Sequence, residues 1–473
     1  MRNSDAVWCL VEEKAPGFHR LSDHVWDKPE LNYSEFAASA AHEKMLREQG
    51  FRVETKIAGL PTALMGEAGE DGPVIAILGE FDALPGLSQE AGVPFRRPLV
   101  SGGNGHGCGH NVLGAAALLA ATAVKDWLAA GARKGRVRYY GCPAEENGSG
   151  KGYMVRAGVF SDVDIVICWH PGDFTGVSKA RSLACVEMEF TFEGLAAHAA
   201  VAPHLGRSAL DAVELMNVGV NYLREHIPST ARVHYAITDS GGNAPNVIQA
   251  RASARHLIRA ADLDDLCDLT DRVKNIAQGA ALMTQTSVRQ KQLSGEANLV
   301  ANRPLEEVMH ATLLRLNGPG FDAADRRFAA EVQKTFSADD IRTAYARYGL
   351  VPQEGEVLSE GVFPMDYAGE YLIGSTDVGT VSWVVPTVQC RVACYAIGTP
   401  AHSWQLVAQG KTPAAHKGLT HSAKAMAGVA IELLCNEHLL RSAKLEFDAF
   451  RARHPFRNPI ADEVVPPLEM AAS

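Results

Sequence analysis

The amino-acid sequence predicts an α/β fold, with a mostly parallel central sheet covered by helices on both faces and a smaller α+β domain inserted into it. Two observations support this prediction. Up to residue 184, β-rich apolar runs alternate with helical segments, as they do in doubly wound sheets. The order then becomes strand, helix, strand, strand, helix, and helical segments return from Pro304 onward. We therefore expect a first domain made of residues 1–185 and 300–473, and an inserted domain made of residues 186–299.

The elements expected in the first part of the chain follow a regular order. Two helices are followed by strands, by one long apolar helix and by further strands. We expect helices at residues 19–27, 34–49, 112–130 and 150–158, and strands at residues 51–57, 73–81, 136–144 and 164–169. Asn111 is expected to cap the long apolar helix, because an asparagine side chain accepts hydrogen bonds from the free backbone N–H groups of a helix start.

The inserted domain begins with VEMEFTFEG, residues 186–194, where apolar and acidic residues alternate as in a half-exposed antiparallel strand. Its other expected elements are a helix at 208–226, strands at 231–238 and 246–260, and a helix at 263–283. For the last part of the chain we expect helices from residue 304 onward, a strand at 388–397, a closing helix at 414–434 and an irregular, Pro-rich tail from His454.

Composition and charge restrict the class of function. The chain has 473 residues, of which 47% are apolar and 21% charged, the balance of a globular protein. Its formal net charge is −10, and without a basic block it is not expected to bind nucleic acid. The N-terminus lacks the apolar core of a signal peptide, and the longest aliphatic run, residues 112–124, is shorter than the about 20 residues that span a bilayer. Nine scattered cysteines suggest reduced thiols, so we expect a cytoplasmic protein.

Polar residues follow three of the expected strands, at the point where each strand ends. Asp82 follows PVIAILGEF, Glu145 and Glu146 follow RVRYYGCPA, and His170 ends DIVICWH. In an open α/β sheet the carboxyl ends of the strands share one edge, where ligands bind. We therefore expect these carboxylates and this imidazole to meet in one region, beside the loop that carries Cys108.

The hexapeptide GHGCGH, residues 105–110, offers two kinds of metal ligand. Cys108 and His110 are two residues apart, and thiolate and imidazole both bind zinc-like divalent ions. The alternative is a Gly-rich turn with an incidental thiol. The strand ends described above favour the metal site. His106 is expected to be an ordinary loop histidine.

The neighbouring carboxylates of Glu145 and Glu146 are expected to have different roles, because adjacent side chains of an extended chain point in opposite directions. One of them would bind metal, and the other would act as general base toward a metal-bound water. A solvated acidic turn is the alternative. Asp82 would accept a hydrogen bond from a ligand imidazole and fix its tautomer, or else cap the following turn.

Further candidates lie in the inserted domain and near the C-terminus. His198 lies in a Gly/Ala-rich loop, and Asn246 and Arg259 lie near the two ends of a long expected strand. Together these three would bind a carboxylate-bearing substrate and polarise a scissile carbonyl, although each alone is typical of an ordinary surface residue. His402, in the loop GTPAHSW, is placed to complete a metal shell. Two remaining histidines, His416 and His421, are expected to be surface or core residues.

These residues also lie in motifs that resemble the aminoacylase, carboxypeptidase and hippurate-hydrolase family of metallopeptidases. The motifs cover nearly the whole chain in the family's order: GEFDALPGLSQ, GHGCGHN, YGCPAEENGSGK, WH of CWHPGD, AAHAAVAPHLGRSALDAV, VHYAITDSGGNAPNVIQA, GSTDVG and GTPAHSWQLVAQGK. The resemblance implies a zinc-peptidase-like catalytic domain with an inserted α+β lid, which often forms a dimer contact.

The resemblance also implies a role for each candidate. A pair of divalent ions, manganese or zinc, would be held by Cys108, His110, Glu146, His170 and His402. Glu145 would be the catalytic base. His198 would stabilise the oxyanion, commonly reaching across a dimer, while Asn246 and Arg259 would contact substrate.

Three positions depart from the family's pattern. Asn111 stands where hippurate-hydrolase-like members usually have Asp, although closer relatives also have Asn. Asn147 replaces the more usual Gly after the two glutamates. Thr380 stands where close relatives tend to have Asp, which bears on substrate preference and not on the hydrolytic centre.

The function expected from these features is hydrolysis of an amide bond in an N-acyl amino acid that has a free carboxylate, such as p-aminobenzoyl-glutamate. The same chemistry would also suit an indole-acetyl-aspartate-type conjugate or an unusual dipeptide. Two other classes compete: a cysteine hydrolase that uses Cys108 as nucleophile, and a partner subunit with little activity alone. The expected assembly is a homodimer through the lid, or a hetero-oligomer with a homologous subunit.

Overall fold

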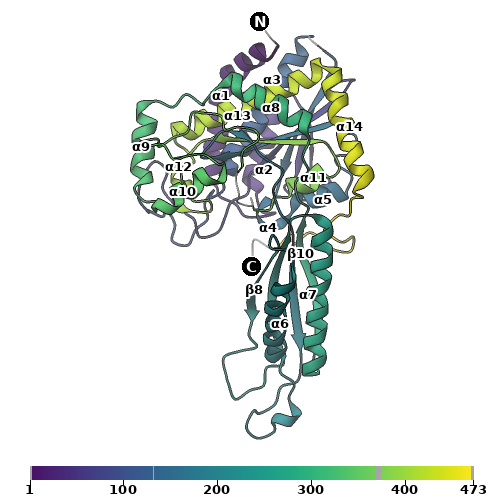
Figure 1. Ribbon diagram of the computed structural model, residues 1–473. Coiled ribbons are helices and arrows are strands. Elements are labelled where there is room, and N and C mark those ends of the chain that lie inside the picture. Colours follow the sequence, from purple (N-terminus) through teal and green to yellow (C-terminus); the bar gives the residue numbers. More distant parts are fainter. Residues whose placement is uncertain (1–2, 132, 369–373, 470–473) are drawn as a thin grey trace.

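The computed structural model describes residues 3–131, 133–368 and 374–469. Figure 1 shows a broad upper body and an elongated lobe that extends from its lower side. The upper body contains a seven-stranded sheet, and the lobe contains a four-stranded sheet. The seven-stranded sheet packs a cluster of buried apolar side chains on each face, and the four-stranded sheet packs a separate one.

The seven-stranded sheet has the order β1-β2-β4-β3-β5-β11-β6. Its strands are β1 (Arg52–Thr55), β2 (Leu64–Glu70), β3 (Val74–Glu80), β4 (Gly135–Cys142), β5 (Ile165–Gly172), β6 (Gly176–Val177) and β11 (Thr387–Ala393). The four inner strands β4, β3, β5 and β11 are parallel, and each of the outer strands β1, β2 and β6 pairs with its neighbour in antiparallel orientation. The mostly parallel sheet predicted from the sequence is therefore confirmed. Strand β2 was not predicted.

Helices cover both faces of this sheet. On one face α1 (Asn3–Trp26), α3 (His110–Ala129) and α13 (Pro413–Cys435) pack together against alternate residues of β3, such as Ile75 and Ile77. On the other face α5 (Gly150–Arg156) and α11 (Val378–Ser382) cover Ala76 and Leu78. A strand buried on both faces needs continuous apolar sequence, which is what VIAIL supplies.

The remaining helices lie around this core. They are α2 (Phe36–Glu48), α4 (Glu145–Gly148), α8 (Arg303–Leu316), α9 (Ala323–Gln333), α10 (Ala338–Arg347), α12 (Trp404–Gln409) and α14 (Glu437–Arg453), with 3₁₀ turns η1 (Ile57–Gly59), η2 (Pro203–Leu205) and η3 (Arg224–His226). By length and composition α3 is apolar enough to cross a membrane, although its aliphatic run alone is too short. However, 83% of its most apolar 18-residue stretch is buried inside the protein. It is the central core helix.

The four-stranded sheet of the lobe has the order β10-β7-β9-β8 and is antiparallel throughout. Its strands are β7 (Ala184–Glu193), β8 (Arg232–Asp239), β9 (Arg251–Ala260) and β10 (Ser287–Glu296), and the helices α6 (Ala209–Leu223) and α7 (Leu263–Thr284) bury its inner side chains. The prediction that β7 is half-exposed was wrong, because β7 is an inner strand of this sheet and seven of its ten residues are buried. The edge strands are β10, which was not predicted, and β8.

Several predicted boundaries also differ from the structure. Helix α1 begins at Asn3, well before residue 19, and α14 was not predicted. Strand β9 begins at Arg251, so Asn246 lies in the preceding loop and not in the strand. The capping role predicted for Asn111 was wrong, since its amide donates to Ser22 Oγ and to the Gly410 carbonyl and ties α3 to its neighbours.

Candidate metal centre

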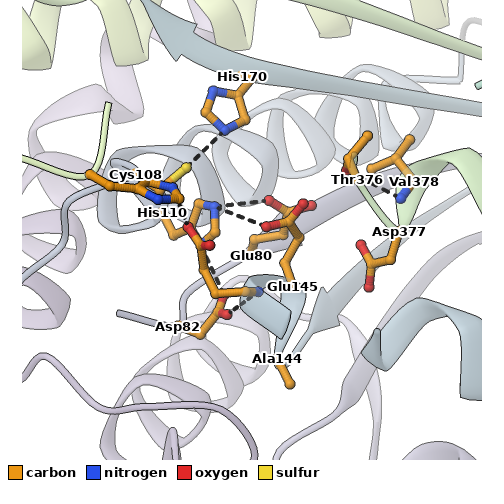
Figure 2. Close-up of polar contacts among 12 residues, drawn as sticks. Glu80, Asp82, Cys108, His110, Ala144, Glu145, His170, Thr376, Asp377 and Val378 are labelled. Atoms are coloured by element: carbon orange, nitrogen blue, oxygen red, sulfur yellow. Dashed lines mark hydrogen bonds and ion pairs between the residues drawn. The ribbon is translucent and has the colours of Figure 1, made fainter. Parts of the chain in front are cut away.

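The candidate centre lies where three parallel strands end, and Figure 2 shows its side chains. Strand β3 delivers Glu80 and, after one residue, Asp82. Strand β4 is followed by Glu145 and Glu146, and His170 lies near the end of β5. Parallel strands place these side chains at one edge of the sheet, as the sequence predicts.

The Cys108 loop packs closely against this edge because glycines flank the cysteine. A Cβ atom on Gly107 would lie 2.4 Å from Leu87 Cδ1, and one on Gly109 would lie 2.3 Å from the Tyr395 hydroxyl. Gly109 also has φ +81°, a left-handed conformation that favours glycine. This packing brings Cys108 Sγ to 3.3 Å from His170 Nε2.

His110 begins helix α3, and its ring is held in one orientation. Its Nδ1 lies 2.8 Å from Asp82 Oδ1, and the other oxygen of Asp82 accepts a hydrogen bond from the backbone N–H of Glu146, at 2.8 Å. With Nδ1 directed at a carboxylate, Nε2 is the ring nitrogen left to face the centre. Burial alone would lower the pKa of His110, but Cys108 and Asp82 raise it well above its usual value, and a metal ion would replace the proton on Nε2. That atom is buried and has no hydrogen-bond partner among the described residues. An orphaned, correctly oriented imidazole nitrogen of this kind is typical of a metal ligand.

The carboxylates of Glu145 and Glu146 face different histidines because the backbone changes direction between the two residues. Ala144 has φ 55°, and Glu146 has φ −73° with ψ 98°, which is not helical. Glu145 Oε2 lies 3.9 Å from His110 Nε2, whereas Glu146 Oε1 lies 3.1 Å from His402 Nε2. His402 itself has φ 54°, a strained conformation that its backbone N–H stabilises by donating to the Gly107 carbonyl at 2.9 Å.

Three groups of side chains have ligand atoms within 4.8 Å of one another. They are Cys108 with His110 and His170, Cys108 with Glu146 and His402, and Glu80 with His110 and Glu145. Two ligands held at about 2.1 Å from one ion in tetrahedral geometry are about 3.4 Å apart. The separations of 3.3 Å and 3.1 Å within the first two groups are close to that value. The donor set therefore fits divalent ions such as zinc or manganese.

The charges of this region also fit cations. Burial, followed by the carboxylates of Glu80 and Glu146, raises the pKa of Glu145 well above its usual value. Burial and Glu146 likewise raise the pKa of the Cys108 thiol. Burial is the largest influence on His170, and it lowers the pKa of that imidazole well below its usual value, which leaves the ring neutral as a ligand must be. Buried carboxylates that raise one another's pKa values are ionised together only when positive charge lies between them.

Sequence reasoning missed four charged residues at this edge. Lys151 is fully buried and contacts both Glu80 and Asp377. Glu35, also buried, accepts hydrogen bonds from Thr62 Oγ1 at 2.7 Å and from the Ala144 N–H at 2.8 Å, so it supports the turn that carries the two glutamates. For Glu80, Lys151 and Asp377 the signals in the sequence were charged residues beside apolar runs, in GEF, GSGKG and STDVG, and Glu35 had no comparable signal.

The structure does not bring the candidates of the lobe to this centre. His198 is exposed in the loop after β7, at the end of the lobe sheet opposite Arg259, and Asn246 lies beside it, with the Ala199 N–H donating to the Asn246 carbonyl at 3.0 Å. Arg259 lies at the opposite end of the lobe sheet, where its Nη1 donates to Ser375 Oγ at 2.8 Å.

The other residues singled out from the sequence have ordinary structural positions. Thr380 is buried in α11, and its Oγ1 accepts a hydrogen bond from the Ala297 N–H at 3.0 Å. His106 is buried, with Nε2 at 3.0 Å from the Val25 carbonyl. His416 stacks on His19, and His421 is buried in α13.

Comparisons with known proteins assign the chain to a family. Residues 76–287 match the model of Peptidase family M20/M25/M40. The chain is 43% identical to a p-aminobenzoyl-glutamate hydrolase subunit of Escherichia coli strain K12, over 96% of this chain and 97% of that protein. It is 29% identical to a mouse (Mus musculus) Xaa-Arg dipeptidase, over 92% of this chain and 90% of that protein.

A solved structure shares the fold. The crystal structure of a dinuclear metal-binding peptidase of the M20 family from Bacillus subtilis superimposes with a TM-score of 0.57 at 19% identity, over 89% of this chain and 99% of that chain. The likeness to the E. coli protein runs through nearly all of both chains, and the ligand groups of a metal centre lie at the sheet edge. The chain belongs to Peptidase family M20/M25/M40 and is a metal-dependent amidohydrolase.

Proposed function

We propose that the protein hydrolyses the amide bond of an N-acyl amino acid with a free carboxylate, using two divalent ions. The observation that carries the proposal is the position of Cys108, which belongs to two of the three ligand groups. One ion would be held by Cys108, His110 and His170, and the other by Cys108, Glu146 and His402. Cys108 would then contribute a ligand atom to both sites.

Each residue around the ions would have a separate role in the reaction. When bound, the ions would polarise the scissile carbonyl and lower the pKa of the attacking water. Glu145 would accept a proton from that water and deliver it to the leaving amine nitrogen, because its carboxylate faces the centre without belonging to either Cys108 group. Asp82 would keep His110 in the required tautomer through its 2.8 Å contact.

Oxyanion stabilisation would come from His198 of a second copy of the chain. Its Nδ1 accepts backbone N–H groups from Ala200 and Val201, at 3.2 and 3.3 Å, so its Nε2 carries the proton and can donate it to an oxyanion. The ten residues of β7 lead away from the catalytic sheet to this loop, and a strand of that length extends about 33 Å. His198 is thus remote from the centre of its own chain.

The inserted residues 186–299 would act as a lid and as the surface for dimer formation. Strand β8 is the free edge of the lobe sheet and exposes Tyr235 and Ile237, with 40% and 48% of their surface accessible. The exposed face of α6 adds Tyr222, which is 71% accessible. We propose this edge and this helix as the contact in a homodimer. A hetero-oligomer is the alternative, since the E. coli relative is named as a subunit.

The substrate we propose is p-aminobenzoyl-glutamate or a near analogue, because the relative with that activity in its name is 43% identical over nearly the whole chain. Arg259, at the junction of lobe and body, would bind the substrate carboxylate, and Asn246 would contact substrate from the same side as His198. A dipeptide is the alternative, supported by the likeness to the Xaa-Arg dipeptidase.

The test uses the purified single chain with Mn²⁺ or Zn²⁺ added. A panel of N-acyl amino acids and dipeptides is assayed before and after chelation, and metal content is measured in parallel. We expect two ions per chain, loss of activity on chelation and recovery when metal is restored. Full activity in chelator with no bound metal would refute the proposal, and loss of that activity on mild alkylation would point to a cysteine hydrolase.

A further inference from the structure

A buried trio of charged side chains lies beside the metal centre. Lys151 Nζ is 2.6 Å from Glu80 Oε1 and 2.6 Å from Asp377 Oδ1, and the side chains of the three residues are 0%, 5% and 0% exposed. Burial alone would lower the pKa of Lys151, but Asp377 and Glu80 outweigh it and raise that pKa well above its usual value. The ammonium is therefore a fixed positive charge between two carboxylates.

The trio is rigid because each member has more than one contact. Asp377 Oδ2 accepts the backbone N–H of Lys151 at 2.9 Å, while Oδ1 of the same carboxylate accepts the Lys151 ammonium. Asp377 precedes α11, and Lys151 lies in α5, so two helices on one face of the sheet hold the ammonium in place. Glu80 ends strand β3 and has only one oxygen engaged by Lys151.

The second oxygen of Glu80 faces the centre. Its Oε2 lies 3.4 Å from His110 Nε2, the buried nitrogen without a hydrogen-bond partner among the described residues. That separation equals the distance of about 3.4 Å expected between two ligands of one tetrahedral ion. A divalent ion that replaced the proton on Nε2 would also lie within reach of the second oxygen of Glu80, and both atoms can donate a lone pair to it. In Figure 2, Glu80 and Glu145 point toward the same nitrogen.

We infer that Glu80 is a further protein ligand of the ion bound to His110, and that Lys151, held by Asp377, is the residue that positions it. The inference rests on the proposed metal centre and adds to it a ligand that neither Cys108 group contains. A carboxylate with one oxygen neutralised by an ammonium is a weaker ligand than a free one. The ion on this side would therefore keep more of its Lewis acidity than it would with an unpaired carboxylate as ligand.

The test measures metal binding and not turnover. Apoprotein of the wild type and of Glu80→Gln, Lys151→Met and Asp377→Asn is titrated with Mn²⁺ by calorimetry, and with Co²⁺ while its visible absorption is recorded. Glu80→Gln should weaken one of the two sites by at least about tenfold and change the Co²⁺ spectrum. Lys151→Met and Asp377→Asn should weaken the same site, because Glu80 loses its orientation.

The control is Arg138→Met. Arg138 lies on β4 in the same sheet and is likewise held between two carboxylates, with Nε at 2.5 Å from Glu67 and Nη1 at 2.6 Å from Asp162. The Arg138→Met variant shows how far loss of a cation shared by two carboxylates affects the protein in general. Both of its metal sites should bind metal as tightly as in the wild type. Thermal unfolding of each apoprotein separates loss of fold from loss of a ligand.

The outcomes distinguish failure of the proposed metal centre from failure of the role inferred for Glu80. If the wild type binds no ion, the proposed metal centre fails. If the wild type binds two ions and Glu80→Gln binds both with unchanged affinity and an unchanged spectrum, only the role of Glu80 is overturned. If Glu80→Gln weakens one site but neither Lys151→Met nor Asp377→Asn does, the positioning role of Lys151 is overturned.

Discussion

Conservative substitution of Glu145 and of Glu146 should have different effects on turnover and metal binding. Glu145→Gln keeps the shape of the side chain but cannot accept a proton, so turnover should fall by about 10²–10⁴-fold while both ions stay bound. Glu146→Gln removes a charged ligand next to His402, so metal occupancy should fall and added metal should restore part of the activity. Metal content and kcat of both variants check this. Loss of metal from Glu145→Gln, with an inactive but fully loaded Glu146→Gln, would reverse the two assignments.

Glu35 gives a prediction about pH. Burial and the nearby Asp82 raise the pKa of Glu35 to about 8, so the folded protein holds this proton more tightly than the unfolded chain. The stabilisation from Glu35 is therefore complete below about pH 4.5 and is lost as pH rises through about 8. Glu35→Gln keeps an acceptor for the Ala144 N–H but does not titrate. Between about pH 5 and 8.5 its unfolding free energy should fall less than that of the wild type.

Chemical denaturation at several pH values measures this difference. Glu48→Gln is the matched control, because Glu48 is an exposed carboxylate on the neighbouring helix α2, with 53% of its side chain accessible. Its unfolding free energy should change with pH in the same way as that of the wild type. A Glu35→Gln profile parallel to that of the wild type would show that Glu35 does not titrate in this range.

At the scale of single residues, the sequence identified the side chains that lie in recognisable motifs and missed those that act through contacts. Cys108, His110 and His170 lie in Gly-rich or strand-end positions that can be recognised without a structure. Glu80 and Lys151 cannot be recognised in this way, because a charge next to an apolar strand is usually solvated, and only the fold shows that these two are buried together.

At the scale of elements, the turn α4 shows how local strain serves the site. Ala144, Asn147 and Ser149 have φ values of 55°, 66° and 54°, an uncommon concentration of left-handed residues without glycine. Asn147 stands where the family usually has glycine, and the positive φ explains that preference, since asparagine tolerates this conformation better than most residues.

Substitution of Asn147 tests the turn. Asn147 is exposed, so Asn147→Gly should leave kcat unchanged. It should lower the unfolding free energy by no more than about 1 kcal/mol. Asn147→Val places a β-branched residue at positive φ, and it should lower the unfolding free energy by about 1–2 kcal/mol and reduce turnover by displacing the two glutamates. Equal stability of the two variants would show that the turn adapts to either residue.

The elements that the sequence predicted well were those with strong apolar periodicity, such as β3, α3 and α7. The elements that it missed have weak patterns. Strand β2 contains two glycines and two glutamates, and β10 is largely polar over its exposed half. Their pairing with β4 and with β7 decides their structure, and that information is not local.

At the scale of the whole molecule, the remote position of His198 predicts complementation between inactive variants. Glu145→Gln and His198→Ala should each be nearly inactive as homodimers. Mixed in equal amounts and allowed to exchange subunits, they should form heterodimers with one intact site, which amounts to about a quarter of the wild-type sites. Recovery of activity on mixing, measured together with the oligomeric state, checks this. An active monomer, or no recovery despite exchange, would contradict a role for His198 across the dimer.

The shared position of Cys108 also has a consequence for oxidation. A thiolate is oxidised readily to sulfenic acid and beyond, whereas a carboxylate in a bridging position is not. Because one sulfur atom belongs to both proposed ligand groups, a single oxidation would remove a ligand from both ions at once. The activity of the whole site would then depend on the redox state of one atom, and a reducing environment would be a condition of function and not merely of storage.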